Sequence, residues 1–304
     1  MKNHFAGLTE KSYQAQELST PPSLGDLLSW GQSELKVLGE PEAQTSAQWL
    51  LAEAAGIKRS QFYLESDREI SREQANIFKG FIAKRKKRMP LAYVVGKAYF
   101  WNETLEVGPE CLIPRPETEI LVEKFIECSG FRTNQSLSLM DLCAGSGAIG
   151  IALAQHFIKA QVTFLDVSYE ALQILKRNLK RCHLLGRTQI ICSDLFKALG
   201  HLKWHAIICN PPYLAQADWQ DVEPEIWQEP RQALNGGQDG LDFYRQVICS
   251  AKDSLAAGGW LALEMGKGQS DILRRWLQRG GYESIQCFKD YAGIDRVILA
   301  QVGV

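Results

Sequence analysis

The segment Asn210-Pro211-Pro212-Tyr213 combines residues that are suited to holding a planar amide or amine. It directly follows residues 206–209, an apolar run that is typical of a buried strand. Two consecutive prolines fix the backbone and remove two N–H donors, so the turn offers carbonyl acceptors. Asn210 adds an amide that both donates and accepts, and Tyr213 adds an aromatic face. We predict that the whole segment, Pro212 included, contacts a substrate and that catalysis involves Asn210, Pro211 and Tyr213.

The chemistry that fits this turn is alkyl transfer to a nitrogen whose lone pair is delocalised. Such a nitrogen is a weak nucleophile, so it must be held in line with an electrophilic carbon. Positive charge grows on the nitrogen during transfer, and acceptors aimed at it stabilise the transition state more than the ground state. The alkylated amide is strongly acidic, which removes the need for a tuned base. The structural alternative is an Asn-Pro turn that only ends a strand.

A second group of residues, Asp141 to Gly150, is typical of a nucleoside-binding turn between a strand and a helix. Gly145 and Gly147 allow the backbone to bend tightly and to approach a ligand, because no Cβ intervenes. The spacing is D-x-x-x-G-x-G, whereas dinucleotide sites have G-x-G-x-x-G. Gly150 stands where the third glycine of the dinucleotide pattern would fall, so a dinucleotide site remains an alternative.

Acidic residues belong to the first three predicted strands of this region. Asp141 lies in the first, and Asp166 ends the second, where a carboxylate can accept both ribose hydroxyls. Asp194 ends the third, where it could meet an adenine amino group. Ligands of open α/β sheets bind at the carboxyl ends of the strands, so we expect Asp166 and Asp194 to bind a cofactor. The structural alternative is that such acids only cap the helices that follow.

Strands alternate with helical patterns from about Glu117 onward, which predicts an α/β domain with a mostly parallel, doubly wound, Rossmann-like sheet. The last two strands have only a short link, Asp290–Asp295, and we expect them to form an antiparallel hairpin. The predicted strands number seven and span residues 137–142, 161–166, 189–192, 206–209, 260–264, 284–288 and 296–301.

The chain before this region has a different pattern. Residues 1–22 are polar, end in two prolines and are expected to form a flexible leader. Residues 23–89 carry apolar side chains at helical spacing, with an N-cap signal at Ser71, and predict a small helical bundle. Residues 90–110 alternate apolar and polar side chains and predict a β-hairpin linker. Residues 111–304 then form the α/β domain.

The composition is that of an ordinary globular protein. The 304 residues are 45% hydrophobic and 23% charged with a formal net charge of -1, so no overall basic field favours nucleic acid. No apolar run reaches the roughly 18 residues of a membrane span, and the start lacks a signal-peptide pattern. The eight cysteines form no C-x-x-C pair, and the five histidines do not join them at metal-ligand spacing. We expect reduced thiols, no metal, no membrane contact, a cytoplasmic location and a monomer.

Three segments together resemble one known family. They are D-L-C-A-G-S-G-A-I-G-I-A-L-A at 141–154, N-P-P-Y at 210–213 and L-I-P-R-P-E-T-E at 112–119. From about Ser23 to Gln301 the chain is similar to the bacterial protein-glutamine N5-methyltransferases called HemK or PrmC. The N-P-P-Y segment alone is shared with DNA adenine and ribosomal RNA guanine methyltransferases. The segment Arg115-Pro116-Glu117-Thr118 distinguishes the protein-glutamine family better from related methyltransferases.

This resemblance implies a class I methyltransferase fold that uses S-adenosylmethionine and releases S-adenosylhomocysteine. It implies methylation of the glutamine in the Gly-Gly-Gln motif of class I peptide chain release factors, which modulates translation termination, with the helical domain helping to hold the protein substrate. It implies substrate contacts at residues 210–213 and cofactor contacts at Cys143, Ala144, Gly145, Ser146, Gly147, Asp166, Leu195 and Asn210.

Two positions depart from the family pattern. The glycine-rich turn begins with Cys143-Ala144, where the family often has Gly-Thr, and Leu195 stands where an aromatic residue commonly stacks on adenine. We expect the leucine to cover the adenine face with looser affinity.

Other functions remain as alternatives. The same chemistry could act on a ribosomal protein glutamine or on an exocyclic amine of DNA or ribosomal RNA, although the near-neutral charge argues against a nucleic acid substrate. A non-catalytic cofactor-binding module is the alternative from another class, and the intact N-P-P-Y segment argues against it.

Two further features could be structural or functional. Lys84 to Arg88 are five consecutive basic residues at an expected helix end, where cations suit the helix dipole. We interpret them as a solvated face, with contact to RNA or to an acidic protein surface as the alternative. Trp219, Trp227 and Tyr244 could line a substrate groove or belong to the core.

Overall fold

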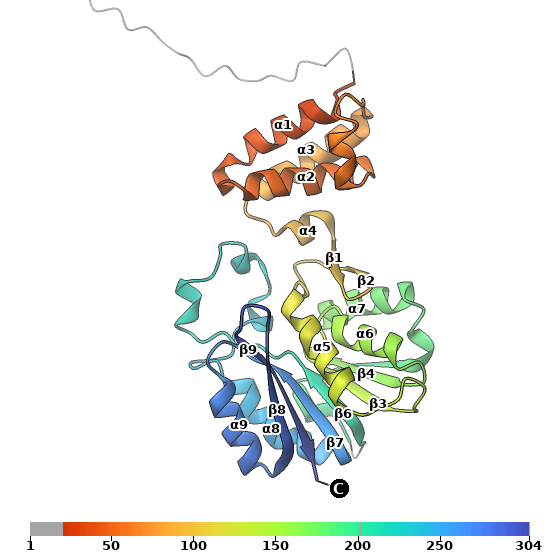
Figure 1. The fold of residues 1–304 in the computed structure, drawn as a ribbon, viewed down its shortest axis with the longest axis vertical. Helices are drawn as coiled ribbons and strands as arrows, with labels where there is room; N and C mark the ends of the chain where they lie inside the picture. Colours follow the sequence, from red (N-terminus) through yellow and green to blue (C-terminus); the bar gives the residue numbers. More distant parts are fainter. Residues whose placement is uncertain (1–20, 201, 304) are drawn as a thin grey trace, which may run out of the picture. The chain divides into compact units, whose positions relative to one another are not determined.

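The computed structural model describes residues 21–200 and 202–303, which form two compact units. The first unit ends at Lys87 and the second begins at Arg88 (Figure 1). The predicted leader, residues 1–22, lies outside the described residues except for Pro21 and Pro22. No helix in the described part of the chain is both long and apolar enough to cross a membrane.

The first unit contains three helices, α1 (Leu24–Glu34), α2 (Glu42–Ala55) and α3 (Arg72–Lys86). Short 3-10 turns, Lys36–Leu38 and Arg59–Tyr63, lie between them. The Ser71 hydroxyl accepts the Gln74 backbone N–H at 3.1 Å while the Gln74 side chain accepts the Ser71 N–H at 3.1 Å. This capping box satisfies two N–H groups at the start of α3 and confirms the predicted N-cap. The helices enclose apolar side chains that include Leu24, Leu27, Leu50, Phe78 and Ile82.

The basic run Lys84–Arg88 is not uniformly solvated. The Arg85 side chain is buried, forms an ion pair with Glu42 of α2 and lies 3.3 Å from the Ser46 hydroxyl. Lys84, one residue earlier, is exposed. Our interpretation of the run as a solvated face is therefore wrong for Arg85, because this residue faces α2 and joins two helices of the unit.

The second unit is built on a sheet of seven strands in the order β5-β4-β3-β6-β7-β9-β8. The first five strands of this order, from β5 to β7, pair in parallel with their neighbours. Strand β9 is antiparallel to both β7 and β8. Each predicted strand overlaps an observed one, so the α/β fold with a late antiparallel hairpin is confirmed. The strands are β3 (Ser138–Leu142), β4 (Gln161–Asp166), β5 (Thr188–Cys192), β6 (Trp204–Cys209), β7 (Leu255–Glu264), β8 (Tyr282–Lys289) and β9 (Asp295–Val302).

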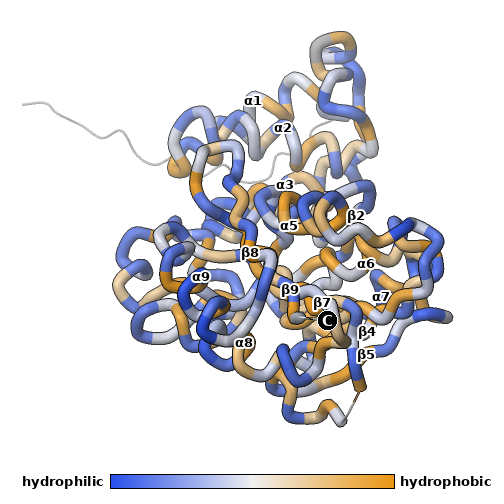
Figure 2. The backbone as a smooth tube through the Cα atoms, turned by 60° about the horizontal axis from the view of Figure 1, so that its bottom comes forward, coloured by the Kyte–Doolittle hydropathy of each residue, from blue (hydrophilic) through white to orange (hydrophobic). Residues whose placement is uncertain are grey.

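Helices cover both faces of this sheet, as Figure 1 shows. Helices α5 (Pro116–Cys128), α6 (Ala148–His156) and α7 (Tyr169–Arg181) pack on one face, and α8 (Asp242–Ser254) and α9 (Ser270–Arg279) on the other. Strand residues alternate between the two cores, with Ala206 and Ile208 on the first and Ile207 and Cys209 on the second. A strand buried on both faces must be apolar throughout, and Figure 2 shows hydrophobic colouring around β7 and β9.

The expected hairpin spans β1 (Lys97–Phe100) and β2 (Glu103–Glu106), which pair antiparallel from Lys97 opposite Glu106. Residues Leu91–Val95, separated from the hairpin by Gly96, form the helix α4, although their alternation suggested a strand. The Asn178 side chain of α7 connects this hairpin to the turn after β3. Its amide accepts the Glu106 N–H at 2.7 Å and donates to the Ser146 carbonyl at 3.0 Å.

We predict that Arg85→Ala lowers the free energy of unfolding of the helical unit by about 1.5–3 kcal/mol, because a buried charged hydrogen-bond donor is lost. The matched control is Lys84→Ala in the same helical turn, which changes stability by less than about 0.5 kcal/mol. Urea denaturation followed by circular dichroism measures both. Equal midpoints for the two variants would contradict a structural role for Arg85.

Candidate functional site

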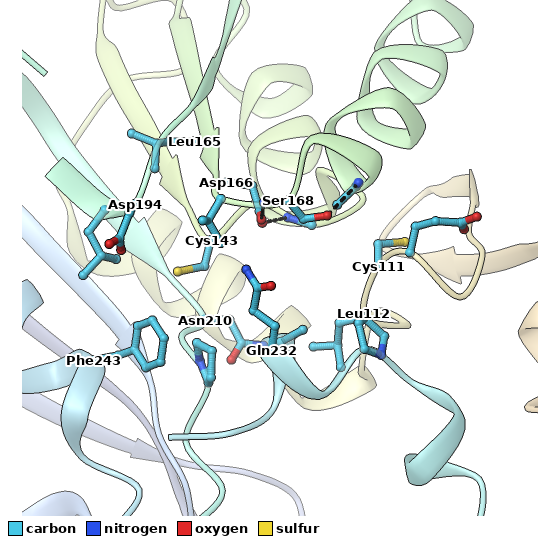
Figure 3. A pocket seen from close by; sticks show the side chains of 18 of the residues that line it. Cys111, Leu112, Cys143, Leu165, Asp166, Ser168, Asp194, Asn210, Gln232 and Phe243 are labelled. Carbon is cyan, nitrogen blue, oxygen red and sulfur yellow. Dashed lines mark hydrogen bonds between the residues drawn. The ribbon is translucent and has the colours of Figure 1, made fainter. Parts of the chain in front are cut away.

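A cavity of about 320 Å³ lies at the carboxyl ends of the parallel strands, at the lower end of the range for small-molecule pockets (Figure 3). The strand order explains its place. β4 and β5 lie on one side of β3, and β6 and the later strands lie on the other. Connections from neighbouring strands diverge at such a reversal and leave a crevice in which α/β proteins bind ligands.

The turn after β3 supplies one wall of the cavity. Cys143 and Gly145 line it, and the Cys143 backbone has φ 61°, a left-handed conformation that favours glycine. The Ala144 N–H donates to the Leu165 carbonyl at 3.0 Å and so holds this turn against β4. The position where this chain departs from the family pattern is therefore one where the backbone itself is strained.

Two glycines of this segment allow close packing of helices and strands and do not line the cavity. A Cβ at Gly147 would lie 2.2 Å from Leu175 of α7, and one at Gly150 would lie 2.3 Å from Phe164 of β4. Close helix–strand packing is also the role of the third glycine in dinucleotide sites. Gly150 thus does not discriminate between the two types of site.

Asp141 lies outside the cavity, in contrast to the acids of the next two strands. Its carboxylate is buried and accepts the Gly150 N–H at 2.8 Å in the first turn of α6. Burial raises the pKa of Asp141 well above its usual range. The helix-capping alternative therefore holds for this acid.

Asp166 lines the cavity and is held there by two backbone donors. Gly145 N–H donates to Oδ2 at 2.8 Å, and Ser168 N–H donates to Oδ1 at 2.9 Å. Burial raises the pKa of Asp166, and these N–H groups oppose that shift by stabilising the charged form. Each carboxylate oxygen keeps a further lone pair, so the group can accept two adjacent hydroxyls.

Asp194 and Leu195 line the cavity after β5. Asp194 is half-exposed and pairs with Lys197 at 2.5 Å. Leu195 is buried and has φ 47°. Phe243 of α8 adds an aromatic ring to the same cavity, as Figure 3 shows, and sequence reasoning missed it. Leu165, Leu195 and Phe243 form an apolar wall that suits a flat ring.

The N-P-P-Y segment closes another side. Asn210 and Pro212 line the cavity, and Pro211 is buried. The Asn210 Nδ2 donates to the Thr118 hydroxyl at 3.2 Å. Tyr213 is half-buried, and its hydroxyl lies 3.4 Å from Glu264 Oε1.

Two loops that sequence reasoning did not assign to the site also line it. They contribute Glu110, Cys111 and Leu112 from one loop and Pro230, Gln232 and Ala233 from the other. Buried Glu229 joins the loops, because it pairs with Arg115 and accepts the Ile113 N–H at 3.1 Å. The family resemblance of residues 112–119 was a signal for the first loop, but it did not indicate that the two loops meet.

The predicted site residues thus fall into two groups. Those that line the cavity are Cys143, Gly145, Asp166, Asp194, Leu195, Asn210 and Pro212. Those outside the lining are the buried residues Ala144, Ser146, Gly147 and Pro211 and the half-buried Tyr213.

The aromatic residues left open by the sequence have different environments. Tyr244 is fully buried in the core, and its hydroxyl donates to the Glu264 carbonyl at 2.9 Å. Trp219 is buried under the Arg231 guanidinium, 5.0 Å from the ring centroid. Trp227 is exposed beside it.

The charge of the cavity favours a cationic ligand. Its charged lining residues are the acids Glu110, Asp166 and Asp194, and no Lys or Arg lines it among the described residues. In the described part of the chain, no group of three or more His, Cys, Asp or Glu side chains could hold a metal ion.

Comparison with known proteins agrees with the geometry. The family model "PrmC N-terminal domain" matches residues 26–96, and "Methyltransferase small domain" matches residues 117–240. A solved methyltransferase from Pyrococcus furiosus superposes with a TM-score of 0.52 at 20% identity over 73% of this chain and 100% of that one, which shows the shared fold.

Curated relatives of this chain carry the name release factor glutamine methyltransferase. That of Geobacter sulfurreducens is 35% identical over 278 residues, which cover 91% of this chain and 96% of the relative. That of Thermodesulfovibrio yellowstonii is 37% identical over 256 residues, 84% of this chain and 91% of the relative. Because this identity extends over most of this chain and of each relative, the chain belongs to the release factor glutamine methyltransferase family, as its motifs indicated.

Proposed function

We propose that this protein transfers a methyl group from S-adenosylmethionine to the N5 side-chain amide nitrogen of the glutamine in the Gly-Gly-Gln motif of class I peptide chain release factors. Methylation at this motif would modulate translation termination. The observation that carries the proposal is that Asn210 and Pro212, suited to an amide, line the same cavity as Asp166, suited to a ribose. The names of the relatives support the choice of substrate.

The residues of the cavity fit the cofactor. The open lone pairs of Asp166 would accept the ribose hydroxyls, and Leu165, Leu195 and Phe243 would enclose the adenine. The acidic lining suits a positively charged sulfonium. S-adenosylmethionine, when bound, supplies an electrophilic methyl group.

The N-P-P-Y segment would then hold the glutamine amide. The Asn210 Oδ1 and the Pro211 carbonyl would accept its two N–H groups and fix the direction of the nitrogen lone pair. As positive charge develops on the nitrogen, both acceptors become stronger partners. The methylated amide then releases a proton without a tuned base, in keeping with the absence of histidine from the described cavity lining.

We further propose a cytoplasmic monomer that acts on protein, not on nucleic acid. In it, residues 23–89 recognise the substrate, residues 90–110 form a linker, and residues 111–304 bind the cofactor and catalyse transfer. The net charge of -1 supports a protein substrate.

The function is tested by incubation with a labelled methyl donor and separate candidate substrates. Release factor is expected to gain the label, and release factor with the Gly-Gly-Gln glutamine replaced is expected to remain unlabelled. Labelling of a ribosomal protein or of DNA in place of release factor would identify one of the alternatives.

Asp166→Ala is expected to weaken S-adenosylmethionine binding by roughly 1–3 kcal/mol, because the hydroxyl donors of the ribose lose their acceptor in a buried site. Asp194→Ala is the matched control and should have a smaller effect, since Asp194 is half-exposed and paired with Lys197. Isothermal calorimetry measures both affinities, with melting temperature as a check of folding. Unchanged affinity in a folded Asp166→Ala protein would remove this assignment.

Asn210→Ala and Asn210→Asp are expected to lower the rate of methyl transfer roughly 10²-fold or more while cofactor affinity is largely kept. The alanine removes the acceptor, and the aspartate replaces the NH₂ group with an acceptor and adds negative charge. Single-turnover transfer to release factor at saturating cofactor measures the rate. Transfer at the parent rate by Asn210→Ala would mean that the turn is structural and that the amide-methyltransferase proposal fails.

A further inference from the structure

A chain of hydrogen bonds runs from the cavity into the core behind Asn210. The Asn210 Nδ2 lies 3.2 Å from the Thr118 Oγ1, which lies 2.6 Å from the Glu264 Oε2. Thr118 belongs to α5 and Glu264 is the last residue of β7, and their exposed fractions are 3% and 1%. The other oxygen of Glu264 lies 3.4 Å from the Tyr213 hydroxyl.

The direction of these hydrogen bonds follows from the chemistry of a hydroxyl. Thr118 has one hydrogen, and the short contact with a carboxylate assigns that hydrogen to Glu264. The Thr118 oxygen then presents only lone pairs to Asn210, so it can be satisfied only by the NH₂ end of the Asn210 amide. The Oδ1 end consequently points away from Thr118 and remains available as an acceptor.

The opposite orientation of the Asn210 amide is disfavoured. It would place Oδ1 against the Thr118 lone pairs, or it would require Thr118 to turn its hydrogen away from a buried carboxylate. A buried polar atom without its hydrogen-bond partner destabilises the fold. A flipped Asn210 would also direct its NH₂ group at the NH₂ group of a substrate amide, where both are donors.

We infer that Thr118 and Glu264 are positioning residues for methyl transfer. The Glu264 carboxylate orients the Thr118 hydroxyl, and the Thr118 oxygen holds the NH₂ group of Asn210, so that the Asn210 oxygen faces the substrate amide. The inference rests on the proposed function. It also changes the role expected for Asn210, whose NH₂ group is held by the protein, so that only its oxygen serves the substrate.

The groups around Glu264 make this orientation dependent on pH. Burial raises the pKa of Glu264 to about 7, although Thr118, Arg296 and Tyr213 favour the charged form. Glu117 on α5 adds a like charge, and Tyr244 of α8 donates to the backbone carbonyl of Glu264. Arg296 on β9 is itself paired with Asp290 at 3.2 Å.

The direction of the pH effect on the rate of methyl transfer follows from which of Glu264 and Thr118 donates the hydrogen between them. Above a pH of about 7 the charged Glu264 accepts the Thr118 hydrogen. Below it the protonated carboxyl can donate to Thr118, which is then free to donate to the Asn210 oxygen and to reverse the amide. The rate of methyl transfer should therefore fall as the pH drops through about 7.

The first test is Thr118→Val, which keeps the shape of the side chain and removes the hydroxyl. Single-turnover transfer to release factor at saturating S-adenosylmethionine should be about 10- to 100-fold slower, with cofactor affinity within about twofold of the parent. Thr118→Ser restores the hydroxyl and should return the rate to within about threefold. The matched control is Thr163→Val, another buried threonine of the same unit, whose hydroxyl contacts Trp204 at 3.4 Å. It should leave the transfer rate unchanged.

The second test is the pH profile of Glu264→Gln. The amide oxygen of glutamine can still accept from Thr118, so part of the rate should remain, but the decline below pH 7 should disappear. Transfer by Thr118→Val at the parent rate, no rescue by Thr118→Ser, or an unchanged acid decline in Glu264→Gln would each overturn the inference. Should Thr118→Val fail to fold, the pH profile decides. Because the parent protein is assayed alongside, absence of methyl transfer by the parent would instead reject the proposed function.

Discussion

The site depends on one topological constraint, the convergence of the carboxyl ends of β3, β4 and β6 where the strand order reverses. Asp166 and Asn210 are 44 residues apart in sequence, yet each follows or ends a strand that neighbours β3. The register of these strands, Leu142 opposite Leu165 and Cys209, places both side chains at the same level of the sheet. The carboxylate proposed to bind the nucleoside and the turn proposed to hold the amide therefore face one cavity.

Two residues that line this cavity have a strained backbone, and hydrogen bonds to the sheet fix the turns that contain them. Cys143 and Leu195 have φ values of 61° and 47°, which cost a non-glycine residue of order 1 kcal/mol or more each. Each strained turn is attached to β4, since Ala144 donates to the Leu165 carbonyl at 3.0 Å and Ser193 donates to the Asp166 carbonyl at 2.9 Å. The two positions where the chain departs from the family pattern are thus two positions at which the backbone is fixed by its neighbours.

The strands could be predicted from the sequence because they follow from local periodicity, and the part of the cavity lining that follows β3 to β6 could be predicted because its motifs lie at strand ends. The helix α4 was missed because the alternation in residues 90–110 also fits a short helix before a hairpin. Asp141 could not be told from Asp166 by sequence, since both lie at or next to the end of a strand and only the direction of the side chain decides whether the acid caps a helix or faces the cavity.

The partners of buried polar residues were the hardest feature to predict. Thr118 and Glu264 are 146 residues apart, and their contact depends on how α5 packs on the end of β7. Glu229 joins Ile113 and Arg115 over a similar separation. The periodicity of the sequence does not indicate such pairs, because each pair depends on the register of the whole sheet and on the position of a helix or loop that packs on it.

The N-P-P-Y segment is attached at both ends to the same buried carboxylate. Asn210 reaches Glu264 through Thr118, and Tyr213 reaches its other oxygen directly. Between them two prolines leave the backbone little freedom. The segment is therefore rigid before any ligand arrives, so little orientational entropy has to be lost when an amide binds. For a nitrogen that is a weak nucleophile and needs no base, prior positioning of its acceptors is the main contribution that a protein can make to the rate, and the fold makes that contribution here through a carboxylate that lies outside the cavity lining.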